Sequence, residues 1–133
     1  MIVILCDGSS KGNPGPASIG IIIWERINNP RIIRPTKRIS LPIGIKTNME
    51  AEWMALISAT EIAFKHLNEE AYIFCDSQTV VKQANGIWNV KHENIKALYK
   101  QFKTWKTDRM NIAWVPRQLI YLADKEAQKG SDS

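Results

Sequence analysis

The sequence predicts an α/β fold built on one mixed five-stranded sheet with helices on both faces. Five short apolar runs rich in β-branched residues predict the strands, and segments of helical periodicity separate the later ones. Three successive strands joined by short connections imply antiparallel neighbours, whereas strands that alternate with helices imply parallel crossovers.

The first three strands are expected before any helix. Ile2–Cys6 is a short apolar run that stops at a turn signal, and Ala17–Trp24 follows a loop rich in Gly, Pro and Asn. An Asn-Asn-Pro turn at 28–30 precedes Arg31–Leu41, which carries basic and Ile residues. Because Pro35 cannot donate a ladder hydrogen bond, this third strand is predicted at an edge of the sheet.

The remaining elements alternate between helix and strand. Thr47 or Asn48 is a favourable N-cap for a helix that runs to about Leu67 and is apolar nearly all round. The later elements are expected, in order, at Ala71–Cys75 (strand), Ser77–Ala84 (short helix), Glu93–Thr107 (amphipathic helix), Met110–Val115 (strand) and Tyr121–Lys129 (helix). A polar tail is expected at 130–133.

Length and charge narrow the class of protein. A chain of 133 residues suffices for one core and is too short for two domains. Its 18 Lys and Arg against 13 Asp and Glu give a net charge of +5, which favours an anionic partner such as nucleic acid. No apolar run approaches the roughly 20 residues of a membrane span, and no signal-peptide pattern is present. Two cysteines are too few for a disulfide framework, so a reduced, cytoplasmic protein is expected.

Two of the predicted strands end in the same dipeptide, at Cys6-Asp7 and Cys75-Asp76. Ligands bind at the carboxyl ends of strands in open α/β sheets, so parallel neighbours would bring the two aspartates together. Converging carboxylates repel unless a cation lies between them, and Mg²⁺ suits oxygen ligands. The alternative is that Asp7 begins a turn and Asp76 caps a helix. On the opposite face, the two cysteines would then lie side by side, as free thiols or as a disulfide.

Four motifs in order resemble those of the type 1 ribonuclease H family. The segment 7–16 (DGSSKGNPGP) resembles the family's opening motif, in which a catalytic aspartate precedes a GNPGP loop. The segment 47–52 (TNMEAE) is similar to the family's TNxxAE motif, 76–78 to its DSQ motif, and 114–117 with 123–124 to its WVPR…AD ending. The resemblance covers about Ile2 to Lys129, so a single ribonuclease H domain with the ribonuclease H-like fold is expected at 1–129.

Helix geometry separates the two glutamates of the second motif. Glu50 and Glu52 are two residues apart, hence about 200° around a helix, and cannot face one site together. Glu52 shares a face with Leu56 and Ala59, the side expected to meet the sheet. We therefore expect Glu52 in the site and Glu50 as a first-turn acid favoured by the helix dipole.

The resemblance implies endonucleolytic hydrolysis of the RNA strand of RNA–DNA hybrids, giving 3′-hydroxyl and 5′-phosphate ends. The four implied catalytic and metal-ligating residues are Asp7, Glu52, Asp76 and Asp124. They would hold two Mg²⁺ ions, with Mn²⁺ as a substitute. The expected partner is an RNA–DNA hybrid, and the expected protein is a monomer with no obligate protein partner. The alternatives are a hybrid-binding module with weak catalysis and a DDE-type transposase or integrase, a class that lacks the GNPGP and TNxxxE signals.

Substrate choice requires groups that recognise 2′-hydroxyls, because these distinguish RNA from DNA. The motif positions imply a set of substrate-binding residues: Gly8, Ser9, Gly12, Asn13, Thr47, Asn48, Gln78, His92 and Arg117. For Asn13 and Asn48, turn and cap chemistry is the alternative. Lys96, Lys100 and Lys103 fall on one helical face, either as a basic stripe that follows phosphates or as an ordinary solvated face.

Three departures from the family pattern are visible. Residues 86–91 lead directly into the next helix, without the long basic protrusion of some members, so weaker hybrid affinity is expected. No histidine lies between Trp114 and Asp124, where other members carry one that assists turnover, and Arg117 is the nearest cationic group. Ile120 replaces a common Asn. Trp114 itself is expected in the core.

Overall fold

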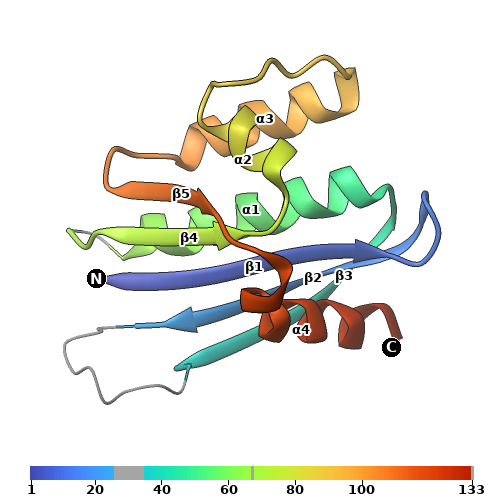
Figure 1. Cartoon of the computed structure of the whole chain (residues 1–133), viewed down its shortest axis with the longest axis horizontal. Coiled ribbons are helices and arrows are strands. Elements are labelled where there is room, and N and C mark those ends of the chain that lie inside the picture. Colours follow the sequence, from blue (N-terminus) through green and yellow to red (C-terminus); the bar gives the residue numbers. More distant parts are fainter. Residues whose placement is uncertain (26–34, 67, 133) are drawn as a thin grey trace.

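The structure is a computed structural model that describes residues 1–25, 35–66 and 68–132 (Figure 1). The predicted turn at 28–30, the beginning of the predicted third strand (31–34) and residue 67 lie outside the described residues. The elements are β1 (Ile2–Ser10), β2 (Gly15–Trp24), β3 (Lys37–Lys46), α1 (Asn48–Lys65), β4 (Ala71–Cys75), α2 (Gln78–Ala84), α3 (Glu93–Trp105), β5 (Met110–Trp114), the 3₁₀ turn η1 (Arg117–Leu119) and α4 (Tyr121–Asp132).

The five strands form one mixed sheet in the order β3-β2-β1-β4-β5. β1 pairs with β2, and β2 with β3, in antiparallel fashion, while β4 runs parallel to both β1 and β5. This arrangement confirms the predicted fold class and places β3 at an edge. It also makes β1 and β4 parallel neighbours, as the convergence of Asp7 and Asp76 requires.

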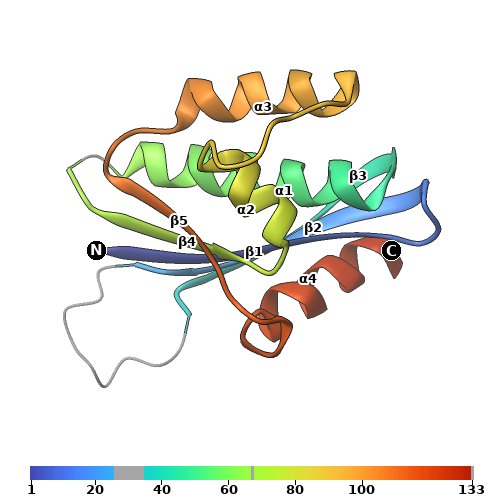
Figure 2. The ribbon, with the colours of Figure 1, turned by 45° about the horizontal axis from the view of Figure 1, so that its top comes forward.

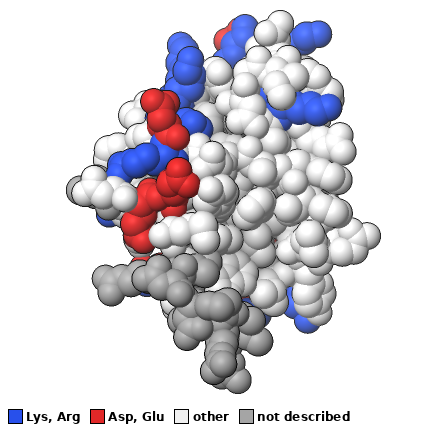
Figure 3. Space-filling model, turned by 60° about the vertical axis from the view of Figure 1, so that its left-hand side comes forward, with Lys and Arg blue, Asp and Glu red and all other residues white. Residues whose placement is uncertain are grey.

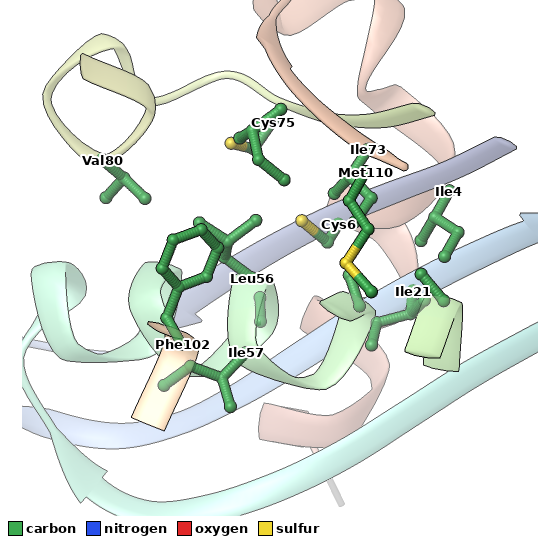
Figure 4. Close-up of a cluster of buried hydrophobic side chains, with 14 of the residues drawn as sticks. Ile4, Cys6, Ile21, Leu56, Ile57, Ile73, Cys75, Val80, Phe102 and Met110 are labelled. Carbon is green, nitrogen blue, oxygen red and sulfur yellow. The ribbon is translucent and has the colours of Figure 1, made fainter. Parts of the chain in front are cut away.

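Helices cover both faces of the sheet (Figure 2). α1, α2 and α3 lie on one face and α4 on the other. Side chains of β1 alternate between the two faces: Ile4 and Cys6 join the core under α1 and α3 (Figure 4). Leu5 packs on the other face, against the cluster that contains Ala123 of α4. No helix among the described residues is both long and apolar enough to cross a membrane.

The two cysteines are free thiols buried in the α1 face of the sheet. Alternation along β1 and β4 places them there together, as predicted (Figure 4). Asp7, the next residue along β1, points to the other face of the sheet. The pKa of the Cys6 thiol is raised well above its ordinary value by a hydrogen bond with Cys75 and by burial. Thiols of this kind behave as core residues.

β1 is longer than predicted. Beyond Cys6 the strand continues to Ser10, because Asp7 pairs with Gly20 and Ser10 with Ala17 in the antiparallel ladder with β2. Only the parallel ladder with β4 stops early, at Leu5 and Phe74. The predicted start of a turn at Asp7 is therefore wrong, and the connection to β2 shrinks to residues 11–14.

β3 and α4 also depart from the predicted boundaries. β3 begins at Lys37, so the proline inside it is Pro42 and not Pro35. Pro42 lies at a break in register with β2, next to Ser18, where an edge strand tolerates proline. α4 continues past Lys129 to Asp132, because Gly130 is buried and packs closely against Ser18. The predicted polar tail is thus helical as far as Asp132.

Candidate active site

Asp7 lies at the centre of the candidate site. Its side chain points to the α4 face of the sheet, and only 6% of the residue is exposed. It stands just beyond the last parallel pair between β1 and β4, so it is flanked by β2 on one side and by the end of β4 on the other. Three further carboxylates reach this position from three other elements.

α1 reaches Asp7 because the next residue, Gly8, has no side chain. A Cβ atom at Gly8 would overlap the Ala51 carbonyl and lie 2.6 Å from the Glu52 amide nitrogen. The first turns of α1 therefore lie directly on β1, and Glu52 comes beside Asp7.

Glu50 serves a different purpose from Glu52. Glu50 Oε1 accepts the main-chain N–H of Thr47 at 3.0 Å, and Thr47 Oγ1 accepts the N–H of Glu50 at 3.1 Å. This reciprocal capping box begins α1 at Asn48 and turns Glu50 away from the site. Glu52, and not Glu50, therefore lies with Asp7 and Asp76 in the group of acids that could hold a metal ion.

Asp76 completes a triad of carboxylates. One ligand atom each from Asp7, Glu52 and Asp76 lies within 4.8 Å of the others. Asp76 is not the helix cap, since Ser77 occupies that place and its Oγ accepts the N–H of Val80 at 3.3 Å. Trp114, expected in the core, is 43% exposed and donates its indole N–H to the Asp76 carbonyl oxygen at 3.0 Å.

Asp124 approaches from α4 through a second glycine. A Cβ atom at Gly20, which pairs with Asp7, would overlap the backbone of α4 at Ala123 and Ala127, so the helix lies directly on β2. Asp124 is thereby brought near Asp7, where its carboxylate contributes to the raised pKa of Asp7.

Two side-chain donors hold the Asp124 carboxylate. Arg117 Nη2 donates to Oδ1 and Gln128 Nε2 donates to Oδ2, both at 3.3 Å. Gln128 was not among the predicted residues. Its position four residues after Asp124, one turn along the same helix face, was the signal available in the sequence.

The electrostatics of the cluster favour a cation. Burial, reinforced by the charges of Asp76, Asp124 and Glu52 and a hydrogen bond to Asp124, raises the pKa of Asp7 to about 9. Burial also raises the pKa of Glu52 to about 7, with the charge of Asp76 adding to it, although a hydrogen bond from Ser77 and the charge of Arg117 lower it. Carboxylates in this state retain protons near neutral pH unless positive charge replaces them.

The carboxylates open into a cleft of about 490 Å³. Of the predicted substrate-binding residues, the structure brings Gly8, Ser9, Asn48 and Arg117 to its walls. Ser10, Lys11 and Gln128 also line it. Ser10 and Lys11 belong to the loop at 8–16 that was expected to contact the substrate, although neither was named singly, and Gln128 was not predicted.

The other predicted substrate-binding residues lie outside the cleft walls. Gly12 is in the turn after β1, with a φ of +94°, and Asn13 bonds to Asn48 from there. Thr47 caps α1, and exposed Gln78 begins α2. His92 is exposed at the N-cap position of α3 and makes no side-chain cap bond.

Sheet order, helix placement and the four acids together define a class: a ribonuclease H-like fold with an acidic site between β1, α1, β4 and α4. The family described as reverse transcriptase-like matches residues 5–130. The chain belongs to this family of ribonuclease H-like domains.

Relatives agree with this assignment. The N-terminal RNase H domain of Rv2228c from Mycobacterium tuberculosis is 36% identical, with a TM-score of 0.86 over 98% of this chain and 93% of that one. Ribonuclease HI of Halobacterium salinarum is 33% identical over 95% of this chain and 62% of its own length. LC11-RNase H1, solved in complex with an RNA/DNA hybrid, is 28% identical, with a TM-score of 0.86 over 99% of this chain and 97% of that one.

The lengths of the relatives differ from that of this chain. It spans only 36% of the mycobacterial protein Rv2228c, which is described as bifunctional.

Proposed function

We propose that this chain is a ribonuclease H that cuts the RNA strand of RNA–DNA hybrids endonucleolytically, using divalent metal ions held by Asp7, Glu52, Asp76 and Asp124. The observation that carries the proposal is the triad of carboxylates from β1, α1 and β4, all within 4.8 Å, with Asp124 beside it. The hybrid bound by LC11-RNase H1, a relative of the same fold, supports the choice of substrate.

The donor set fits a hard divalent cation. Carboxylate oxygens are the ligands that Mg²⁺ and Mn²⁺ prefer, and the raised pKa of Asp7 shows how strongly the cluster lacks compensating charge. A bound pair of such ions supplies charge stabilisation at the scissile phosphate and lowers the pKa of an attacking water. We expect 3′-hydroxyl and 5′-phosphate products.

The protein's own groups fix the geometry around the cluster. Asp7 is held on the central strand and interacts with all three other acids, so it would be a ligand of the bound metal. Asp124 is held by two donors, and its side chain is only 16% exposed. Arg117 remains 73% exposed, so it can contact a substrate phosphate while it holds Asp124.

Recognition of RNA is assigned to the rim formed by the turn after β1 and the start of α1. Asn13 and Asn48 bond to each other across this rim, so turn and cap chemistry is present. Both amides keep groups that can bond a 2′-hydroxyl or a base edge. We extend the same proposal to Gly12, Thr47, Gln78 and His92, which do not line the cleft.

A substrate panel tests the proposal. The protein is incubated in Mg²⁺ with an end-labelled RNA strand in three forms: paired with DNA, paired with RNA, and single-stranded; a labelled DNA duplex is the fourth substrate. We expect internal cleavage of the RNA–DNA hybrid alone, with 5′-phosphate ends that a phosphatase removes. Binding of the hybrid without cleavage would identify a weak or inactive binding module instead, and cleavage of the DNA duplex would point to a different nuclease class.

A further inference from the structure

Ser10, the last residue of β1, links the following turn to the start of α1. Its main-chain N–H donates to Asn48 Oδ1 at 3.2 Å, and its hydroxyl lies 2.7 Å from the same oxygen. The hydroxyl also lies 2.5 Å from the carbonyl oxygen of Gly12. A serine has one hydroxyl proton, so that proton is shared between an acceptor in the turn and an acceptor on the helix.

Two bonds from Ser10 hold the Asn48 amide in one orientation. The main-chain N–H of a residue held in a strand cannot turn round, so it favours the carbonyl oxygen opposite it, and the Ser10 hydroxyl adds a second restraint on the same oxygen. Asn13 is oriented in a similar way, because its Oδ1 accepts the main-chain N–H of Asn48 at 3.0 Å. Both carbonyl oxygens are therefore used inside the protein.

The NH₂ groups of the two amides are left for another partner. Within residues 1–25, 35–66 and 68–132, neither the Asn13 nor the Asn48 NH₂ group donates a hydrogen bond to the protein. Ser10 and Asn48 both line the cleft that contains Asp7 and Glu52. The rim beside the acids thus offers hydrogen-bond donors.

We propose that Ser10 is a positioning residue for the choice of RNA: it keeps the Asn48 amide turned so that its NH₂ group faces the substrate strand. The inference rests on the proposed function and deepens it. A ribose 2′-hydroxyl oxygen accepts from such a donor, whereas deoxyribose has no acceptor there. Without the serine hydroxyl the amide loses one of its two restraints, and an amide that turns presents a carbonyl in place of a donor.

The test uses a set of hybrids in which one ribonucleotide at a time is replaced by its 2′-deoxy counterpart. For each, kcat and KM are measured with the wild type, Ser10→Ala, Ser10→Thr, Asn48→Ala and the double variant Ser10→Ala/Asn48→Ala. The wild type is expected to lose efficiency at one or two deoxy positions. In Ser10→Ala, the loss of efficiency caused by the deoxy substitution should be smaller by about 3- to 10-fold, because one hydrogen bond is removed. The change should appear in KM. Ser10→Thr, which keeps the hydroxyl, should retain the penalty.

The double variant shows whether Ser10 acts through Asn48. Ser10→Ala should add nothing once Asn48 is already alanine. Ser10→Cys keeps a side chain of similar size but has only a weak hydrogen-bond donor, so it should behave as Ser10→Ala does. It takes the place of Ser10→Ala if the smaller alanine side chain unfolds the protein. Thr104→Ala, which removes an exposed hydroxyl bonded within α3, is the matched control and should leave the penalty unchanged.

Three results would overturn the inference: an undiminished deoxy penalty in Ser10→Ala and Ser10→Cys, an equal loss on every substrate with kcat reduced, or an effect that persists in the Asn48→Ala background. A wild type that cleaves hybrids without any deoxy penalty would also overturn it, while leaving the proposed function standing. A wild type that cleaves no hybrid at all would refute the proposed function, and the role of Ser10 with it.

Discussion

Asp7 carries the strongest electrostatic conflict among the described residues. It is held beside three other acids in a position that is nearly closed to water, and its pKa rises from an ordinary 3.8 to about 9 for that reason. An acid whose pKa is higher in the folded state gives up a proton more readily when the chain unfolds. Between about pH 4 and pH 9, folding therefore becomes less favourable as the pH rises. Ligand positions of this kind sacrifice stability for function.

The variant Asp7→Asn should consequently be more stable than the wild type. Asparagine has no charge to bury, so we expect its free energy of unfolding to be higher by about 1–2 kcal/mol near pH 8, with the gap narrowing towards pH 4. Urea unfolding at both pH values, in the presence of a chelator, measures this. Asp108→Asn, at an exposed aspartate outside the site, is the control. A wild type as stable as Asp7→Asn near pH 8 would contradict the electrostatic account.

At the residue scale, the sequence motifs contained all four acids of the site, but they did not indicate every residue that surrounds these acids. The four carboxylates occupy motif positions, and the 200° argument separated Glu52 from Glu50. The bonds from Ser10 to Asn48 were missed because a hydrogen bond between two elements leaves no local pattern, whereas Gln128 was missed although its spacing from Asp124 within α4 was visible. Trp114 was placed in the core by its apolar strand, but it lies in the last pair of β4 and β5, opposite Cys75, where it is exposed and its indole N–H donates to the Asp76 main-chain carbonyl oxygen.

At the element scale, two glycines set how close the helices lie to the sheet. Gly8 admits α1 on one face and Gly20 admits α4 on the other, and these contacts bring Glu52 and Asp124 to Asp7. The order and type of the five strands and four helices followed from hydrophobic runs and turn residues, whereas the short 3₁₀ turn η1 was not predicted. The extension of β1 to Ser10 could not be predicted locally, because polar residues remain in a strand there only through pairing with β2.

Gly20→Ala should separate α4 from the sheet. The added methyl group overlaps the backbone of Ala123 and Ala127, so we expect a loss of about 1–3 kcal/mol in the free energy of unfolding. Because Asp124 moves with α4, kcat should fall on the order of 10- to 100-fold. Thermal unfolding and hybrid cleavage measure the two effects.

Gly44→Ala is the comparison for this variant. Gly44 has a φ of +84° and open space around a Cβ atom, so alanine there strains the backbone without displacing a helix. We expect some loss of stability and an unchanged kcat. Equal losses of kcat in the two variants would show that α4 placement does not control the site.

At the scale of the whole molecule, positive charge is distributed unevenly. At the end where the N-terminus lies, acidic and basic side chains lie next to one another (Figure 3), and the terminal amino group pairs with Glu69 at 3.3 Å. Elsewhere, Lys96, Lys100 and Lys103 line a groove of about 680 Å³ together with Trp88. The net charge of +5 predicted an anionic partner, but not which face would meet it.

Replacing the three lysines distinguishes the two interpretations that the sequence left open for this helix face: a basic stripe that follows phosphates, or an ordinary solvated face. If they follow substrate phosphates, replacing all three with alanine should raise KM for the hybrid and reduce the slope of log KM against log salt concentration by about 2–3. The control removes the same charge outside this groove, at Lys65, Lys106 and Arg109. Equal slopes for the two triple variants would assign the α3 lysines to a solvated face.

The central claim is that the acids gathered around Asp7 cut RNA in a hybrid with the aid of divalent metal. Its most direct measurement is the rate of cleavage of a labelled RNA–DNA hybrid in Mg²⁺ by the wild type and by Asp7→Asn in parallel. We predict cleavage by the wild type that a chelator abolishes, and a loss of at least about 1,000-fold in the variant, which should still fold. If Asp7→Asn cleaves as well as the wild type, the assignment of the site is wrong.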